Sequence, residues 1–203
     1  MWIDVLHHWD EVATLWLNQW HSPLTDQMMV FLSDKKVWIP VYAAVALMLI
    51  RRLGWKKALV MILTAGLTFL ACDQCSSLIK DSVARLRPCY NRYMIEGGIR
   101  ILEGRGSLFG FFSAHAANVF GFAWVTCLGW KNDPSYDGRP YAWFIFTWAV
   151  LVSLSRIFVG KHFLGDVLAG ALIGSILGYA FVRLGNWFIA QFLERDASSS
   201  AAS

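Results

Sequence analysis

The sequence predicts an all-α integral membrane protein, a bundle of about five transmembrane helices preceded by an amphipathic N-terminal helix. Of its 203 residues, 57% are hydrophobic, with 11 Trp and 14 Phe, which is above the usual share of a soluble domain. The apolar residues form blocks close to the roughly 20 residues that a helix needs to cross a bilayer. These blocks are Val37–Ile50, Ala58–Ile79, Leu108–Trp130, Tyr141–Leu154 and Phe163–Phe188. The first is short and contains Pro40, so we expect it to be tilted or to include Phe31–Leu32.

The N-terminal segment is predicted to be helical and to remain in the protein. It has no basic start and no small-residue cleavage site, so it is not a secretory signal. Its apolar residues follow helical spacing: Trp2, Val5, Leu6, Trp9, Val12, Ala13, Trp16 and Trp20. The polar face carries acids (Asp4, Asp10 and Glu11) rather than the usual Lys and Arg. Two placements stay open, one in the membrane interface and one packed against the other spans. We expect residues 1–190 to form one domain and 191–203 a disordered tail.

The charge distribution argues for a membrane and against nucleic acid as the partner. The net charge of +4 comes from Lys and Arg in short joints between apolar blocks, without a long basic run. The joint RRLGWKK, residues 51–57, has four basic and no acidic residues, so the positive-inside rule places it in the cytoplasm. Residues 80–115 and 155–166 then lie together on the extracytoplasmic side. More Lys and Arg fall on that side in total, but many are in the long segment Asp81–Ser107, and long loops count for less.

The four cysteines do not predict a metal centre. Cys72 and Cys75 have a metal-ligand spacing, but no second pair follows, and within an apolar run they are expected to pack as small hydrophobes. A disulfide involving Cys89 is compatible with an extracytoplasmic location, without a partner that the sequence identifies.

Polar residues cluster at three joints of the apolar blocks, all on the predicted extracytoplasmic side. The clusters are Lys80 with Arg87, Ser113 with His115, and Ser155 and Arg156 with His162 and Asp166. Each alone has a structural explanation, such as a snorkelling lysine or an i,i+4 pair on one helix face. Together, however, they place cations, two histidines and a carboxylate at one membrane face, where charge is costly and by default functional.

This composition is typical of phosphoryl transfer. A transferring phosphoryl group needs positioned positive charge and N–H donors, which Lys80, Arg87, Arg156 and the helix start near Ser113 can supply.

The two histidines would divide the covalent chemistry. A carboxylate that accepts from one ring N–H fixes a histidine in the tautomer that can attack phosphorus, and Asp166 follows His162 by one helical turn. His115 would protonate the leaving alkoxide and later activate water. Because no cluster of carboxylates suggests a bound cation, we expect a reaction that needs no metal and no cofactor.

The residues resemble the type 2 phosphatidic acid phosphatase superfamily, membrane relatives of the vanadium haloperoxidases. Its motif Lys-x6-Arg-Pro matches Lys80 to Pro88, and Ser-Arg-x5-His-x3-Asp matches Ser155 to Asp166. Pro-Ser-Gly-His is matched at Ser113 and His115 but replaced by Phe112 and Ala114. We expect activity to survive these replacements, because the reacting side chains remain.

The resemblance implies a helical membrane bundle and assigns the site. It makes His162 the nucleophile, Asp166 its orienting acid and His115 the general acid and base. It places the phosphate against Lys80, Arg87, Ser113, Ala114 and Arg156.

Three further features lie outside the motifs. His162, Asp166, Gly170, Gly174 and Gly178 step by four residues, a stripe that lets another helix approach closely. Asp73 lies two turns before Lys80, and we favour a structural hydrogen bond for it over a functional role. Arg92, Arg100 and Arg105, beside Tyr90 and Tyr93, would either contact a headgroup or, as we favour, lie in a solvated loop.

The predicted activity is removal of phosphate from a lipid phosphate or diphosphate at the outer face of an inner membrane. The family implies undecaprenyl diphosphate, phosphatidylglycerophosphate, phosphatidic acid or phosphorylated lipid A, without a choice among them. Two alternatives remain: transfer of phosphate from one lipid to another, and binding or transport of a lipid phosphate without turnover. The intact His162 and Asp166 pair argues against the second. The sequence does not indicate an oligomeric state.

Overall fold

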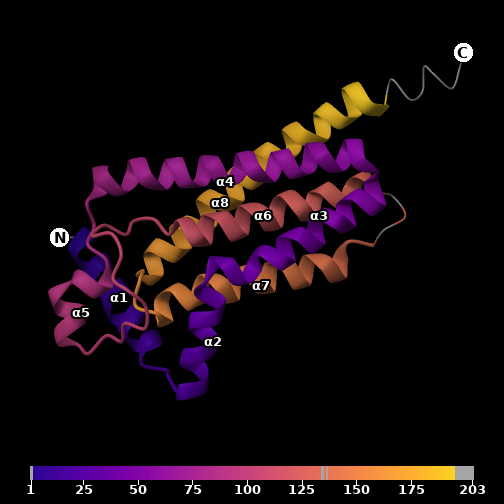
Figure 1. The fold of residues 1–203 in the computed structure, drawn as a ribbon. Helices are drawn as coiled ribbons and strands as arrows, with labels where there is room; N and C mark the ends of the chain where they lie inside the picture. The colour runs from indigo at the N-terminus through magenta and orange to yellow at the C-terminus, as the bar shows by residue number, and fades with distance from the viewer. Residues whose placement is uncertain (1, 134, 136, 195–203) are drawn as a thin grey trace, which may run out of the picture.

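The structure is a computed structural model that describes residues 2–133, 135 and 137–194. Five helices form the bundle: α3 (Ile39–Leu53), α4 (Trp55–Val83), α6 (Ala114–Gly129), α7 (Arg139–Phe158) and α8 (Leu164–Phe188). The other elements are α1 (Trp2–Asn18), α2 (Pro23–Ser33), η1 (Lys35–Trp38), η2 (Pro88–Tyr90), α5 (Arg92–Glu96), η3 (Trp130–Asn132) and η4 (Ile189–Glu194). Figure 1 shows α1 and α5 at one end of the bundle, with the α3–α4 connection at the other.

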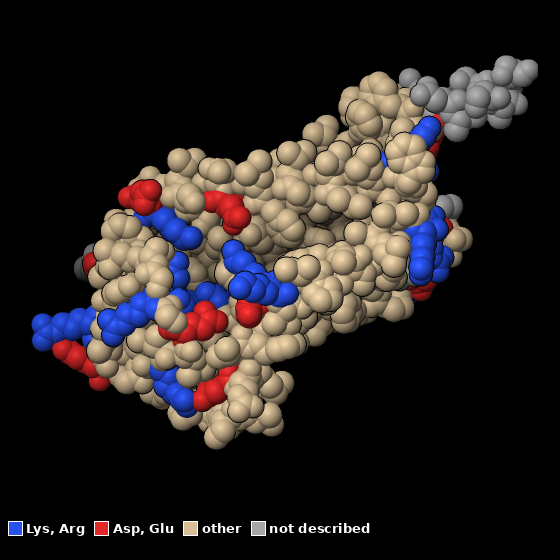
Figure 2. Space-filling model, viewed as in Figure 1, with Lys and Arg blue, Asp and Glu red and all other residues tan. Residues whose placement is uncertain are grey.

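The outer surface of the bundle is apolar, as a lipid environment requires. The helix α4, the helix α7, and α8 continued through η4 are long and apolar enough to cross a membrane. Along α4, the exposed side chains Leu59, Leu63, Leu67 and Leu70 recur at helical spacing, an apolar row that a soluble monomer rarely shows to water. Figure 2 shows a broad uncharged band between charged groups at the two ends. The helices α3 and α6 have 15 and 16 residues, so a count of five crossings stays a prediction.

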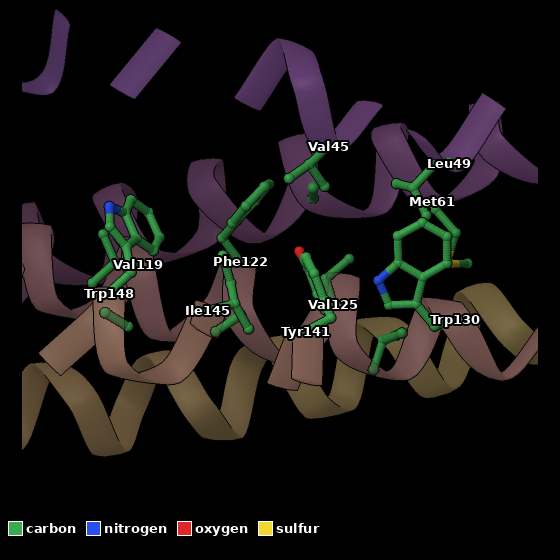
Figure 3. Packing of buried hydrophobic residues seen from close by; sticks show 14 of the residues in the cluster. Val45, Leu49, Met61, Val119, Phe122, Val125, Trp130, Tyr141, Ile145 and Trp148 are labelled. Atoms are coloured by element: carbon green, nitrogen blue, oxygen red, sulfur yellow. The ribbon is translucent and has the colours of Figure 1, made fainter. Parts of the chain in front are cut away.

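The helix α6 is the centre of the bundle, and α3, α4, α7 and α8 surround it. Its packing against α3, α4 and α7 forms the main hydrophobic core (Figure 3), in which Phe122, Ile145 and Trp148 are buried. On the side facing α8, the predicted glycine stripe allows close approach. A methyl group at Gly170 or Gly174 would overlap the backbone of Ser113 or Ala117 on α6. The predicted role of this stripe is confirmed.

The predicted helix start near Ser113 is confirmed, but the apolar block Leu108–Trp130 begins before the helix. Residues 108–113 precede the helix, because Leu108 and Gly110 pair with the segment that leaves α4: the Arg87 amide donates to the Leu108 carbonyl (3.0 Å) and the Gly110 amide to the Arg85 carbonyl (2.9 Å). The helix α6 begins at Ala114, with Ser113 as its N-cap. This extended pair of segments crosses the end of the bundle that contains the polar clusters.

The predicted disordered tail began too early. Residues 191–194 continue the last helix as part of η4, because the Phe192 ring packs 4.8 Å from the Phe188 ring and Lys57 pairs with Glu194 at 2.7 Å. The remainder of the predicted tail, residues 195–203, lies outside the described residues.

Candidate active site

A polar cavity of about 410 Å³ lies where the three polar clusters meet. Its lining combines the end of α4, the start of α6, the end of α7 and the α7–α8 turn. The lining residues are Lys35, Asp73, Ser76, Ser77, Lys80, Arg87, Ala114, His115, Arg156 and His162. Six of the eight predicted site residues are among them. The other two, Ser113 and Asp166, are fully buried and contact this shell from behind.

The α7–α8 turn positions His162 through backbone hydrogen bonds. The Arg156 carbonyl accepts from the amides of Lys161 (3.0 Å) and His162 (3.2 Å). Gly160 has a φ of 75°, and a side chain there would overlap the Arg100 carbonyl. A glycine is therefore required for the tight turn that brings His162 back beside Arg156.

Asp166 lies in the first turn of α8 and faces the His162 ring. Its Oδ2 atom lies 3.4 Å from His162 Nδ1 and accepts from the Phe163 amide at 3.1 Å. Both side chains are buried. Burial lowers the pKa of His162 to about 4, although the nearby Asp166 carboxylate raises it. The ring is therefore neutral at pH 7, and because Nδ1 faces the carboxylate, Nε2 is the nitrogen available to a group in the cavity.

Three cations of the cavity come from three different elements. Arg87 is fixed by two hydrogen bonds, from Nε to the Phe109 carbonyl (3.1 Å) and from Nη2 to Ser107 Oγ (2.8 Å). Arg156 is 5% exposed and donates to Ser33 Oγ. The Nη1 atom of Arg156 also pairs with Glu103 at 3.5 Å. In the part of the chain that the structure describes, the buried Nε atom of Arg156 has no partner.

The electrostatics of the cavity favour an anion. Burial lowers the pKa of Arg87, which lines the cavity, and that of the neighbouring Lys161 below their ordinary values. At Lys161 the Glu103 carboxylate opposes this shift, and the charges of Arg156 and Arg87 add to it. Cations that are desolvated close to one another are stabilised by a negative group placed between them.

The start of α6 brings the second cluster into the same wall. The Ser113 hydroxyl accepts from the Ala116 amide (3.4 Å), and the Ser113 amide donates to the Asp166 carbonyl at 3.0 Å. This contact joins the second and third motifs. Phe112, which replaces a motif proline, is fully buried against Cys72 and Ala117. The replacement therefore fills the core behind the site instead of shaping its surface.

A second cavity, of about 250 Å³, continues from the polar one into the bundle. The two cavities share Lys35, Asp73 and His115, and the walls of the second are mainly aromatic and aliphatic. They include Trp38, Tyr42, Phe69, Val119 and Val152. His115 therefore lies at the boundary between a polar, cationic space and an apolar one.

Several lining residues lie outside the three motifs. Asp73, Ser76, Ser77 and Lys80 share one face of α4, because they are spaced three, four and seven residues apart, and this spacing was readable from the sequence. Asp73 Oδ1 accepts from Asn118 Nδ2 at 2.9 Å, the hydrogen bond to a neighbouring helix that we favoured. Lys35 had no such signal, since η1 reaches the cavity only through the tertiary fold.

The loop arginines are not part of the cavity lining. Arg92 is exposed and pairs with Glu96, Arg100 pairs with Asp26 of α2 at 2.5 Å, and Arg105 lies over the Tyr90 ring. The exposed Arg92 and Arg105 agree with the solvated position that we favoured, whereas Arg100 is partly buried in its ion pair.

The cysteines and possible metal ligands add no second centre. All four cysteines are free, and Cys72 is buried among apolar side chains, as predicted. Among the described residues, no three His, Cys, Asp or Glu side chains gather as metal ligands. Metal independence stays a prediction.

Comparisons with known proteins identify the family of this chain. The family model of the PAP2 superfamily matches residues 53–190. The lipid A 4'-phosphatase of Bacteroides thetaiotaomicron is 37% identical over 94% of this chain and 81% of its own, and that of Porphyromonas gingivalis is 32% identical over 81% and 68%. The undecaprenyl-diphosphatase of Sulfolobus acidocaldarius is 30% identical over 88% and 75%.

A solved structure shares the fold. The crystal structure of a PAP2 type phosphatidylglycerolphosphate phosphatase from Bacillus subtilis has a TM-score of 0.72 and 21% identity, covering 93% of this chain and 89% of its own. The prediction of an integral membrane protein is thereby supported at the level of the fold. The chain therefore belongs to the PAP2 superfamily and, like these relatives, is a phosphatase, as its three motifs predicted.

Proposed function

We propose that this protein hydrolyses a lipid phosphate or diphosphate through a phosphohistidine intermediate. The observation that carries the proposal is the junction of the two cavities at His115. A phosphate in the cationic cavity would have its ester or anhydride oxygen beside His115. The lipid chain would then extend along the apolar cavity. A substrate without an apolar part would leave that second cavity unused.

The first step is attack by His162. The lone pair of its Nε2 atom forms a bond to phosphorus, and the bond from phosphorus to the leaving oxygen breaks with its electron pair. A protonated His115 gives its proton to that oxygen. The Nδ1–H group of His162 donates to Asp166, which stabilises the positive charge that develops on the ring. Lys80, Arg87 and Arg156 stabilise the negative charge of the non-bridging oxygens.

The second step returns the enzyme to its first state. The neutral His115 takes a proton from a water molecule, whose oxygen attacks phosphorus. The bond between Nε2 and phosphorus breaks, the electron pair returns to the imidazole, and inorganic phosphate leaves. No group outside the chain is required beyond water.

Phosphorylated lipid A is the substrate that we place first. Two relatives that carry a lipid A 4'-phosphatase name are 37% and 32% identical to this chain, and the relative named as an undecaprenyl-diphosphatase is 30% identical. The boundary between the cavities also carries Asp73 and Lys35, and Asn118 lines the apolar cavity beside Asp73. Carboxylate, amide and ammonium groups suit the hydroxyl and amide groups of a sugar headgroup better than a bare prenyl chain.

We further propose that the site faces the extracytoplasmic side of an inner membrane. The α3–α4 connection carries Arg51, Arg52, Lys56 and Lys57 and lies at the opposite end of the bundle from the α7–α8 turn (Figure 1). The positive-inside rule keeps such a turn in the cytoplasm. A reporter that works only in the cytoplasm should therefore be active when it is fused after residue 194. Activity of a reporter that works only in the periplasm, fused at the same position, would contradict this orientation.

The test of the activity is phosphate release by the detergent-purified protein from a panel of lipids with EDTA present. The panel contains lipid A 1,4'-bisphosphate, undecaprenyl diphosphate, phosphatidylglycerophosphate and phosphatidic acid. We expect release by the wild type, none by His162→Ala, and unchanged release by His21→Ala, in which an exposed histidine is lost. Trapping of acid-labile, base-stable phosphoprotein should follow the same pattern. Binding without release would support the non-catalytic alternative, and phosphorylated lipid as the product would support phosphotransfer.

A further inference from the structure

Arg85, in the variable gap of the first motif, joins Asp166 to the N-terminal helix. Its Nη1 atom donates to Asp166 Oδ1 at 2.7 Å, and its Nη2 atom donates to Asp10 Oδ2 at 2.6 Å. Asp166 is 0% exposed, and the side chains of Arg85 and Asp10 are 16% and 15% exposed. The guanidinium lies 4.1 Å from the centre of the Phe163 ring. A planar fork with two carboxylate partners and an aromatic face can adopt few other orientations.

Arg85 lies on the far side of Asp166 from the polar cavity. It does not line that cavity and instead lines a separate space of about 590 Å³ between α1 and the start of α8. A direct contact with the substrate phosphate is therefore not its role. Asp166 Oδ1 faces Arg85, while Oδ2 faces the His162 ring. The arginine thus determines which carboxylate oxygen is left for the histidine.

The polar face of α1 holds the rest of the catalytic turn. Asp10 Oδ1 accepts from the Gly165 amide at 2.8 Å, and Thr14 Oγ1 accepts from the Leu164 amide at 2.9 Å. At the other side of the turn, Asn18 Nδ2 donates to the Ile157 carbonyl at 2.9 Å. These are the first amides of α8 and a last carbonyl of α7, groups that a helix end leaves without internal partners. The helix α1 therefore caps both helices that carry the third motif.

We propose that Asp10 and Arg85 are positioning residues that fix the Asp166 carboxylate, and through it the Nδ1–H tautomer of His162. The proposal rests on the proposed role of His162 as nucleophile, but the geometry that it concerns exists without turnover. With the carboxylate free to rotate, His162 would populate the tautomer with a protonated Nε2, which cannot attack. The contacts of Asp10 with Arg85 and the Gly165 amide thereby explain one of the acidic residues on the amphipathic helix, where a membrane-surface helix usually carries Lys or Arg.

Asp10→Asn and Arg85→Lys test this clamp, with Glu11→Gln as the matched control. Glu11 is adjacent on α1 and contacts Asn91 and His7. It touches no clamp residue itself and reaches Arg85 only through His7, whose Nδ1 atom lies 3.1 Å from Arg85 Nη2. We expect kcat to fall about ten- to hundred-fold in the two clamp variants, with KM little changed, and both parameters to stay at wild-type values in the control. In an Asp166→Asn background, Asp10→Asn should add no further loss, because it acts through that carboxylate.

A second measurement is independent of activity. In protein labelled with ¹⁵N-histidine, the His162 resonances are identified by their loss in His162→Ala and report which ring nitrogen carries the proton. We expect the Nδ1–H tautomer in the wild type and in Glu11→Gln, and a mixture of tautomers in Asp10→Asn and Arg85→Lys. An unchanged tautomer in both clamp variants would overturn the proposal even if the protein hydrolysed no lipid. If the wild type hydrolysed no lipid but the tautomer still changed in the clamp variants, the result would support the clamp and contradict only the proposed function.

Discussion

The Nδ1 atom of His162 lies 3.4 Å from the Oδ2 atom of Asp166, and both side chains are buried at the α7–α8 turn. Burial disfavours the charged imidazolium, and the carboxylate favours it. Burial is the larger effect, so the pKa of His162 falls to about 4. The balance leaves the ring unprotonated across the physiological range, as the proposed role of His162 as nucleophile requires.

Removing the Asp166 charge should move the acid limb of the pH profile to lower pH. The carboxylate raises the pKa of His162, so Asp166→Asn lowers it and keeps the ring unprotonated in more acidic solution. At the same time kcat should fall, because the orienting acceptor is lost. The measurement is kcat/KM from pH 3.5 to 8 in the wild type and in Asp166→Asn. Both proteins are given the same lipid, so the titration of the substrate affects the two profiles equally. A limb that moved to higher pH would contradict the assigned balance.

Arg156→Lys should reduce kcat/KM about hundred-fold although the positive charge is kept. The guanidinium donates to Ser33 and keeps a buried Nε–H available, and a lysine cannot reproduce two donors in one plane. Arg92→Lys, at an exposed helical pair, is the matched control and should change little. Phosphate release at several lipid concentrations measures both, and equal effects of the two substitutions would argue against Arg156 as a phosphate ligand.

Asp73→Asn should increase the use of diphosphate substrates relative to monophosphates by a few-fold. The side chain lines both cavities at their boundary, where a carboxylate repels a second phosphate and an amide does not. The isosteric amide can keep a hydrogen bond to Asn118. Asp81→Asn, on the same helix but outside the cavity lining, controls for loss of charge. The ratio of release from undecaprenyl diphosphate and undecaprenyl phosphate measures the effect, and an unchanged ratio would leave Asp73 with a structural role alone.

Gly174→Ala should destabilise the protein by about 1–3 kcal/mol or more, as overpacked cores do. Its added methyl would overlap the Ala117 backbone on α6, so α8 would have to move outward. Gly66→Ala is the control, because its methyl points into open space on α4 and should be neutral or slightly stabilising. Thermal unfolding in detergent compares them; a Gly174→Ala protein as stable as the wild type would show that the close approach of the two helices is dispensable.

The sequence by itself determined the helical membrane fold and most of the candidate site. Long apolar blocks restrict a chain to structures that satisfy every backbone group internally. Five motif residues meet in one cavity because each lies at or near a helix end on the same side of the bundle. They are Lys80, Arg87, His115, Arg156 and His162. Charged residues at such positions can be recognised from the sequence alone, because a charge beside a membrane span is costly and by default functional.

Only the tertiary structure decided what supports that site. The extended path of residues 108–110 before α6 depends on their pairing with residues 85–87, a contact between segments about 20 residues apart. Lys35 reaches the cavity, and Asp10 reaches Arg85 across 75 residues of sequence. Such contacts leave no periodic pattern in the sequence, because they are made by isolated polar side chains. The packing of the helices determines which partners these side chains meet.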